Sequence, residues 1–224
     1  MRDFTTSILD LVLGRSCAGC QEPGVLLCTT CADSLQPRVR LRRELDAGDV
    51  MQGLRIPVVC ALDYRGVARQ ILYRYKDHRI RQLAHFLSPA LAASITVSAA
   101  RAEVPLGKSL LIPMPTRRSS IQRRGFDATA TVVRTAATHA GVGGVLSLLE
   151  DVRGSGASKR GGALEREQRA IDAFRVRYER GLPTVPVILV DDIVTTGATT
   201  KEAAETLLLA GVQVAAVATI AGTP

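Results

Sequence analysis

Two adjacent carboxylates followed by a threonine-rich loop form the strongest chemical signal in the sequence. The segment contains Asp191, Asp192, Thr195, Thr196, Gly197, Ala198 and Thr199. The carboxylates could accept hydrogen bonds from a vicinal diol or help to hold a divalent cation. A helix beginning near Gly197 would offer unpaired N–H groups and its dipole to an anion, which the small residues allow to approach the backbone. A phosphate beside a diol describes a ribose 5-phosphate.

A second candidate site is a basic turn that follows the apolar run at 109–112. Two prolines, Pro113 and Pro115, precede four arginines, which are Arg117, Arg118, Arg123 and Arg124. Ligands bind at strand ends in open α/β sheets, and arginine suits a pyrophosphate because its guanidinium donates two parallel hydrogen bonds. The alternative is an exposed turn whose arginines face only water.

Four cysteines near the N-terminus are spaced as metal ligands. The pair Cys17 and Cys20 and the pair Cys28 and Cys31 each follow a C-x-x-C pattern. Four thiolates at this separation predict a tetrahedral structural zinc site with no open position for catalysis. Disulfides are the alternative, which a cytosolic location would disfavour. The fifth cysteine, Cys60, lies in an apolar run and is expected in the core.

The sequence predicts that strands and helices alternate along the chain and position these groups. Short apolar runs predict strands over 57–64, 109–112, 145–149, 174–178, 187–190 and 212–220. Apolar residues at helical spacing predict helices over 4–13, 67–77, 83–100 and 127–140, and another over 201–210. This alternation predicts an α/β fold with a mostly parallel sheet, since such strands are buried on both faces.

One predicted helix carries a basic face beside its apolar face. In the helix at 67–77, Val67, Ile71 and Tyr75 are expected to point inward. A different face carries Arg65, Arg69, Tyr73 and Lys76. This face is either a surface for phosphate and stacked bases or a solvated basic face.

The amino-acid composition limits the classes of protein to which this chain can belong. The chain has 224 residues and a formal net charge of +8, and only four of its 29 basic residues are lysines. Arginine excess suits a polyanionic partner, although a genome-wide arginine bias would produce the same composition. No apolar run approaches the roughly 20 residues of a membrane span, and the acidic N-terminal segment is a poor signal peptide, so a cytoplasmic location is expected.

The loop after Asp192 resembles the phosphoribosyl-pyrophosphate (PRPP) signature of type I phosphoribosyltransferases. With the four-cysteine module, the segments 64–66 and 75–76, and the I-P-M-P-T-R-R-x(4)-R-R-G-F-D stretch at 112–127, the chain resembles the ComF family over almost its whole length. These are phosphoribosyltransferase-like proteins tied to competence and DNA uptake. The resemblance implies that Asp191 and Asp192 address the ribose hydroxyls, that residues 192–200 hold the 5-phosphate, and that Arg117 and Arg118 hold pyrophosphate.

The family fold implies a zinc-ribbon-like module on a type I phosphoribosyltransferase domain. The expected division is 1–36 for the N-terminal helix and zinc module, 37–56 for a linker and 57–224 for the larger domain. Residues 151–170 would be a flexible loop that closes over the diphosphate. The sequence departs from the family there, since the usual Thr and Gln before Arg160 are poorly matched in Gly156–Lys159.

Three functions of different classes follow. The first is transfer of phosphoribosyl from PRPP, with Mg²⁺ on the departing pyrophosphate, to an acceptor that the sequence does not identify. The second is binding of single-stranded DNA on the same scaffold, which predicts a steep salt dependence. The third is an adaptor that docks another protein of DNA uptake through the zinc module. Titration with PRPP and Mg²⁺ beside single-stranded DNA separates the first two.

Overall fold

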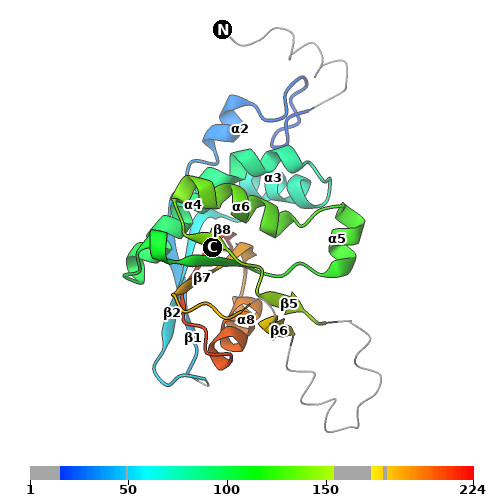
Figure 1. The fold of residues 1–224 in the computed structure, drawn as a ribbon. Helices are drawn as coiled ribbons and strands as arrows, with labels where there is room; N and C mark the ends of the chain where they lie inside the picture. The colour runs from blue at the N-terminus through cyan, green and yellow to red at the C-terminus, as the bar shows by residue number, and fades with distance from the viewer. Residues whose placement is uncertain (1–15, 49, 154–172, 179–180) are drawn as a thin grey trace.

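The main feature of the computed structural model is a six-stranded mixed sheet with the strand order β1-β2-β8-β7-β3-β4 (Figure 1). The model describes residues 16–48, 50–153, 173–178 and 181–224. The strands are β1 (Arg40–Asp46), β2 (Arg55–Asp63), β3 (Leu110–Pro113), β4 (Gly144–Val145), β7 (Val187–Val194) and β8 (Val214–Gly222). Among these described strands only the β1–β2 pair is antiparallel, and the other four pairs are parallel. The predicted α/β class with a mostly parallel sheet is confirmed.

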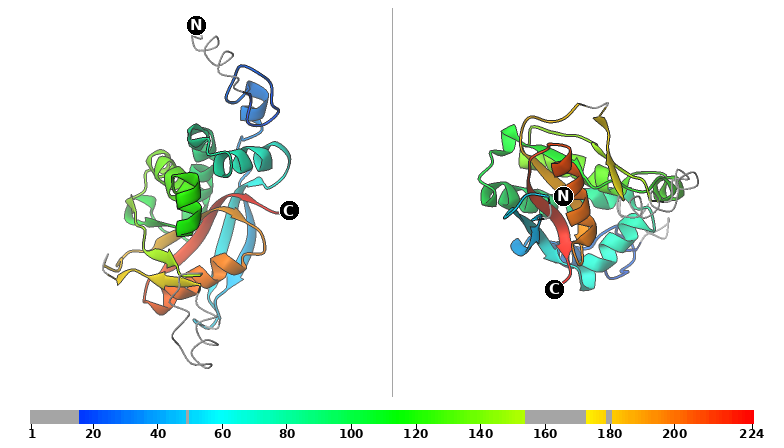
Figure 2. Two further views of the ribbon diagram at one scale, coloured as in Figure 1. Left: turned by 90° about the vertical axis from the view of Figure 1, so that its right-hand side faces the viewer. Right: turned by 90° about the horizontal axis from the view of Figure 1, so that it is seen from below.

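Helices cover both faces of this sheet. One face carries α3 (Gly66–Lys76), α4 (Ala84–Arg101) and α6 (Ala128–Ala140), whose apolar residues form one hydrophobic cluster with β2, β7 and β8. The other face carries α8 (Ala198–Leu209) and a small antiparallel sheet of β5 (Leu149–Asp151) and β6 (Phe174–Val176) (Figure 2). The run Val187–Val190 is completely buried because β7 is central in the sheet and covered on both sides.

The parallel register brings the ends of several strands to one edge of the sheet. Pro113 of β3 lies opposite Val190 of β7, and Asp191 lies opposite Thr219 of β8. Cys60 of β2 also lies opposite Thr219, and its side chain is completely buried, as predicted. The segments that leave the carboxyl ends of β2, β3, β7 and β8 therefore meet at this edge, where α/β sheets bind ligands.

Three predictions about strands are corrected by the structure. The segment 37–56, predicted as a linker, contains β1, which pairs with β2 along the sheet edge. The strand predicted at 145–149 is divided between β4 in the main sheet and β5 in the small sheet. The strand at 174–178 is present as β6, but it pairs with β5 and does not join the main sheet. Pairing partners lie far apart in sequence, so local apolar patterns do not specify them.

The four-cysteine segment packs directly on the larger body of the chain. It includes α2 (Thr29–Asp33) and lies next to α3 in Figure 1. Ala18 and Leu35 are buried in the same hydrophobic cluster as α3 and α4. The module therefore shares a core with the α/β layer. The helix predicted at 4–13 and all but the first three residues of the loop predicted at 151–170 lie outside the described residues.

One helical stretch of the described chain, Arg81–Arg101, is long and apolar enough to cross a membrane by length and composition alone. It comprises a short 3₁₀ turn (Arg81–Leu83) and α4. Most of its most apolar window is buried against the sheet and α6, as in the core helix of many globular folds. This stretch is therefore weak evidence for a membrane span.

Candidate functional site

The two adjacent carboxylates belong to strand β7 itself and not to the loop after it. Asp192 is 3% exposed, whereas Asp191 is partly buried, and both line the same pair of cavities. The backbone N–H of Asp192 donates a hydrogen bond to Asp191 Oδ1 at 2.8 Å. The hydroxyl of Thr129, in the first turn of α6, lies 3.4 Å from Asp192 Oδ2. The rigid strand thus fixes the carboxylates at the edge of the sheet, as expected for a site group.

Lys76, the last residue of α3, forms an ion pair with Asp192 that the sequence does not predict. Its Nζ lies 2.5 Å from Asp192 Oδ2, and its side chain is only 22% exposed. The expected basic face of α3 is therefore divided, because Arg65, Arg69 and Tyr73 are exposed while Lys76 reaches into the site. Residue type and helical spacing do not distinguish these two orientations, since both lie outside the apolar face of the helix.

Burial and neighbouring charges shift the pKa values of Asp191 and Lys76. Burial raises the pKa of Asp191 to about 8, and the negative charge of Asp192 acts in the same direction. Burial alone would lower the pKa of Lys76, but the attraction of Asp192 outweighs it, and the pKa of Lys76 is raised. Lys76 therefore carries its charge at neutral pH, and Asp192 has a permanent positive partner.

The loop after β7 has the form expected of an anion-binding turn. Gly197 has a φ of +80° and is the N-cap residue of α8, with Thr195, Thr196, Ala198 and Thr199 exposed around it. These residues line a cavity of about 400 Å³ together with Tyr64, Lys76 and the two aspartates. The first N–H groups of α8 have no partner further back in the helix, and the helix dipole favours an anion there.

Arg43 holds this loop in place from the strand that the sequence does not predict. Its guanidinium donates to the carbonyl oxygen of Thr195 at 2.6 Å and also to the carbonyl oxygen of Thr196. The hydroxyl of Thr223, just beyond β8, lies 3.3 Å from the same carbonyl of Thr195. These contacts satisfy the carbonyls of Thr195 and Thr196 and so attach the loop to β1 and to the end of β8.

Replacing Gly197 by alanine is expected to impair both the loop and its ligand affinity. An added Cβ would lie 3.2 Å from Leu45 Cδ2 and 3.3 Å from Arg43 Cδ, and the positive φ would cost about 1–2 kcal/mol. The measurements are the free energy of unfolding in urea and the affinity for a phosphorylated sugar.

Gly141 provides a matched control for that variant. It has a φ of +66° at the end of α6, and an added Cβ would meet nothing within 4 Å. Gly141→Ala should carry the same cost of a positive φ, without the close contacts, and leave ligand affinity unchanged. Equal ligand affinity in the two variants would contradict a role of this loop in binding.

The basic turn lies beside a second, smaller cavity, of about 200 Å³. This cavity shares Lys76, Asp191, Asp192 and Thr199 with the larger one, and its other lining residues are Met114, Pro115, Thr116, Arg117, Arg124, Thr129, Asp151 and Arg153. The two cavities thus meet at the carboxylates. A ligand with two anionic ends could extend from the loop of α8 to the basic turn.

The arginines of the basic turn are not equivalent. After Thr116 and Arg117 the chain forms the short helix α5 (Arg118–Arg124). Arg117 lines the smaller cavity with its Nε 3.5 Å from Asp151 Oδ2. Arg118 is 81% exposed, pairs with Glu150 on β5 at 2.9 Å and is not among the residues that line either cavity. The structure therefore places Arg118 outside both cavities, beside Glu150, and its contact with pyrophosphate stays a prediction.

Arg124, at the end of α5, lines the smaller cavity although the sequence assigned it no specific contact. Its side chain is largely buried, and one Nη lies 3.5 Å from Asp77 Oδ1. Asp151, by contrast, is almost fully buried between Arg153 and Arg117. The guanidinium of Arg153 lowers the pKa of Asp151 although burial opposes this, so the carboxylate stays ionised.

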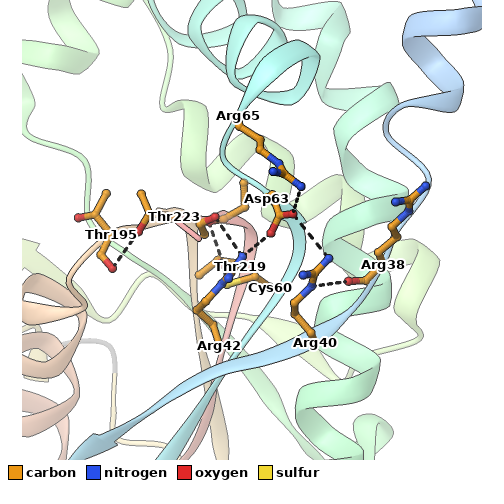
Figure 3. Close-up of polar contacts among 11 residues, drawn as sticks. Arg38, Arg40, Arg42, Cys60, Asp63, Arg65, Thr195, Thr219 and Thr223 are labelled. Carbon is orange, nitrogen blue, oxygen red and sulfur yellow. Dashed lines mark hydrogen bonds and ion pairs between the residues drawn. The ribbon is translucent and has the colours of Figure 1, made fainter.

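A further group of arginines surrounds Asp63 at the end of β2 (Figure 3). Arg42 lies 2.5 Å from Asp63 Oδ1, and Arg65 and Arg40 lie 3.1 and 3.6 Å from Oδ2. The hydrogen bond from Arg42 lowers the pKa of Asp63 despite partial burial. One carboxylate thus neutralises only part of this arginine group, and Arg40 and Arg65 remain exposed to solvent.

The four cysteines meet as the sequence predicts. The Sγ atoms of Cys17, Cys20, Cys28 and Cys31 all lie within 4.8 Å of one another, and the structure contains no disulfide among them. The N–H groups of Gly19 and Cys28 point to Cys17 Sγ at 3.4 and 3.3 Å. Burial acts to raise the pKa of Cys17, but hydrogen bonds from the backbone outweigh it and lower that pKa to about 6. A converging set of thiols with backbone donors fits a tetrahedral metal ion such as zinc.

Comparison with known proteins does not extend these observations. A scan against protein-family models and a search of curated proteins both found no match to the chain.

Proposed function

We propose that this protein binds PRPP, or a related ribose 5-phosphate ligand, at the edge of the sheet, and that it transfers the phosphoribosyl group to an acceptor. The observation that carries the proposal is the junction of two cavities at Asp191 and Asp192. The larger cavity carries the N-terminus of α8 and the threonine loop, which suit the 5-phosphate. The smaller carries Arg117 and Arg124, which suit a pyrophosphate.

The ligand geometry follows from this division. A ribose between the cavities would present its two ring hydroxyls to the carboxylates of β7, which are hydrogen-bond acceptors when ionised. Displacement at the anomeric carbon of PRPP needs positioning and stabilisation of charge, with no protein nucleophile. The type I phosphoribosyltransferase fold and membership of the ComF family are part of this proposal, and they rest on the resemblance of the motifs.

The charges of the site disfavour a divalent cation held by the protein itself. A cation on Asp192 would be repelled by the ammonium of Lys76, which lies 2.5 Å from Asp192 Oδ2. Mg²⁺ is therefore assigned to the substrate, as the salt of its diphosphate, and no step is derived from a resident cation. In the zinc module the residues do fit, and four thiolates would hold the ion structurally without an open position.

Arg117→Ala is expected to weaken the affinity for pyrophosphate and PRPP by about 10- to 150-fold, since a hydrogen bond between charged groups contributes about 1.5–3 kcal/mol. The melting temperature should change by only a few degrees because Arg117 is 55% exposed and Asp151 keeps Arg153 as its partner. The measurement is isothermal titration of the ligands together with thermal unfolding.

Arg118→Ala is the matched control for Arg117→Ala. It removes the same charge from the neighbouring position, but its guanidinium pairs with Glu150 outside the cavities. Its effect on ligand affinity should be severalfold smaller. Equal losses in both variants would contradict the assignment of the smaller cavity to pyrophosphate.

The arginine group around Asp63 supports a second candidate function, binding of single-stranded DNA. Arg40 and Arg65 are exposed at the sheet edge, and Arg38 lies beside them in Figure 3. Such a group could follow a phosphate backbone with an affinity that falls steeply with salt. This surface is separate from the residues that line the smaller cavity. The two functions therefore respond to different substitutions.

A further inference from the structure

Among the described residues, Lys76 is the one lysine that lines both cavities, and it enters the site from an element distant in sequence from the loop of α8. It extends from the end of α3 to Asp192 on β7, where the Nζ–Oδ2 distance is 2.5 Å. Asp192 is 3% exposed, so this pair is largely removed from solvent. A partly buried pair interacts more strongly than an exposed one and is less screened by salt.

The buried residue that precedes Lys76 fixes the end of α3 from which Lys76 extends. Tyr75 is completely buried, and its hydroxyl donates a hydrogen bond to the carbonyl oxygen of Ala128 at 2.7 Å. Ala128 begins α6, and its neighbour Thr129 places its hydroxyl 3.4 Å from the same Asp192 oxygen that pairs with Lys76. The end of α3 and the start of α6 are thus attached to each other and to Asp192. The core of the fold thus fixes the backbone of Lys76 within reach of Asp192, and the ion pair holds the ammonium there.

The ammonium and a divalent cation would compete for this oxygen. Carboxylate oxygens contact Mg²⁺ at about 2.0–2.1 Å, which would bring the ion within a few ångströms of Nζ. Repulsion between the ammonium and a doubly charged ion at that separation is strong where solvent is largely excluded. A cation at Asp192 would therefore have to displace the ammonium of Lys76, at the cost of their ion pair.

We propose that Lys76 is a positioning residue that serves as the fixed counter-ion of Asp192 and takes the place of a protein-bound divalent cation. Asp192 then accepts a hydrogen bond from a sugar hydroxyl while Lys76 balances the charge of the carboxylate. Any divalent cation enters the site only together with a diphosphate ligand. This inference deepens the proposed function and rests on it for the identity of the ligand, but not for the pairing of Lys76 with Asp192.

The first test uses Mn²⁺ as the probe and the ligand-free, full-length protein. Mn²⁺ affinity, measured by electron paramagnetic resonance, should be weak in the parent and rise by about tenfold or more in Lys76→Met, because repulsion is removed from Asp192. The gain should vanish in Lys76→Met with Asp192→Asn, and Lys76→Arg should bind as the parent does. Lys201→Met removes the same charge from α8, where Lys201 pairs with Glu205, and should leave Mn²⁺ affinity unchanged.

Two results would overturn the inference. One is equal Mn²⁺ affinity in the parent and Lys76→Met. The other is tight Mn²⁺ binding by the parent that is lost in Asp192→Asn, and this comparison does not depend on the folding of any Lys76 variant.

A second test separates this inference from the proposed function. Binding of ribose 5-phosphate to the parent should be the same with Mg²⁺ and with a chelator, because Lys76 already balances Asp192. A requirement for Mg²⁺ would contradict the counter-ion role. If neither ribose 5-phosphate nor PRPP binds, the proposed function is wrong, while the Mn²⁺ comparison still decides the role of Lys76.

Discussion

Replacing Cys17 by serine is expected to abolish the binding of one equivalent of Zn²⁺ and to unfold the segment around α2. Cys17 is completely buried, its Sγ accepts hydrogen bonds from the N–H groups of Gly19 and Cys28, and a serine hydroxyl would not supply the thiolate that zinc binds. Binding of structural zinc contributes on the order of 10 kcal/mol, which is the energy that folds so small a module. Metal analysis of the purified protein and limited proteolysis between residues 16 and 36 measure the two effects.

Cys60→Ser is the control for this experiment. Cys60 is also completely buried, but it lies in β2 against Thr219 and outside the four-cysteine cluster. The metal content of this variant should remain at one equivalent even where its stability falls. A parent protein that contains no metal and yet resists proteolysis in the module would contradict the zinc assignment.

Loss of the metal is expected to lower the stability of the whole protein and not of the module alone. Ala18 and Leu35 belong to the same hydrophobic cluster as Ile71 of α3. Unfolding the module would expose part of that cluster to water. The exposure would lower the free energy of unfolding by about 25 cal/mol for each Å² of apolar surface. A chelator should therefore lower the melting temperature of the whole protein, whereas a separate module would unfold alone.

Replacing both carboxylates of β7, as Asp191→Asn with Asp192→Asn, is expected to abolish measurable PRPP binding. A lost hydrogen bond to the charged Asp192 costs about 1.5–3 kcal/mol, or roughly 10- to 150-fold in affinity, and one to Asp191, which its raised pKa leaves largely protonated at neutral pH, costs about 0.5–1.5 kcal/mol. The change is nearly isosteric, but losing the charge of Asp192 would leave the ammonium of Lys76 without its charged partner. Asp191→Asn alone therefore serves as the variant with the smaller effect on stability, and circular dichroism with titration calorimetry measures both.

Asp46→Asn is the matched control for the double variant. Asp46 pairs with Arg55 at the far end of β1 and lines neither cavity. This variant should bind PRPP as the parent does. Parent-like affinity in the double variant itself would contradict the central assignment of the site.

The same double variant distinguishes the two candidate functions. Removing negative charge from a DNA-binding surface removes a repulsion, so affinity for single-stranded DNA should be maintained or rise slightly, with its salt dependence intact. Loss of DNA and PRPP binding together, in a folded protein, would mean that DNA uses the sugar site and not the arginine group around Asp63.

Several features of the molecule could be predicted from local sequence. The four cysteines converge because a C-x-x-C pair places both thiols on one short turn, and only two such turns had to meet. The run at 187–190 is a central strand because four consecutive apolar residues require cover on both faces. The helix after Gly197 begins where small residues and a left-handed glycine allow it.

The tertiary structure decided which charged groups meet. Lys76 and Arg65 belong to one basic segment in the sequence, yet one reaches Asp192 and the other reaches Asp63. Arg117 and Arg118 are adjacent, yet only Arg117 lines a cavity because β5 offers Glu150 to its neighbour. Arg43 supports the threonine loop from a strand whose polar composition resembles a linker. These contacts depend on strand pairing and helix packing between distant segments, and local residue patterns carry no information on the partner of a long charged side chain.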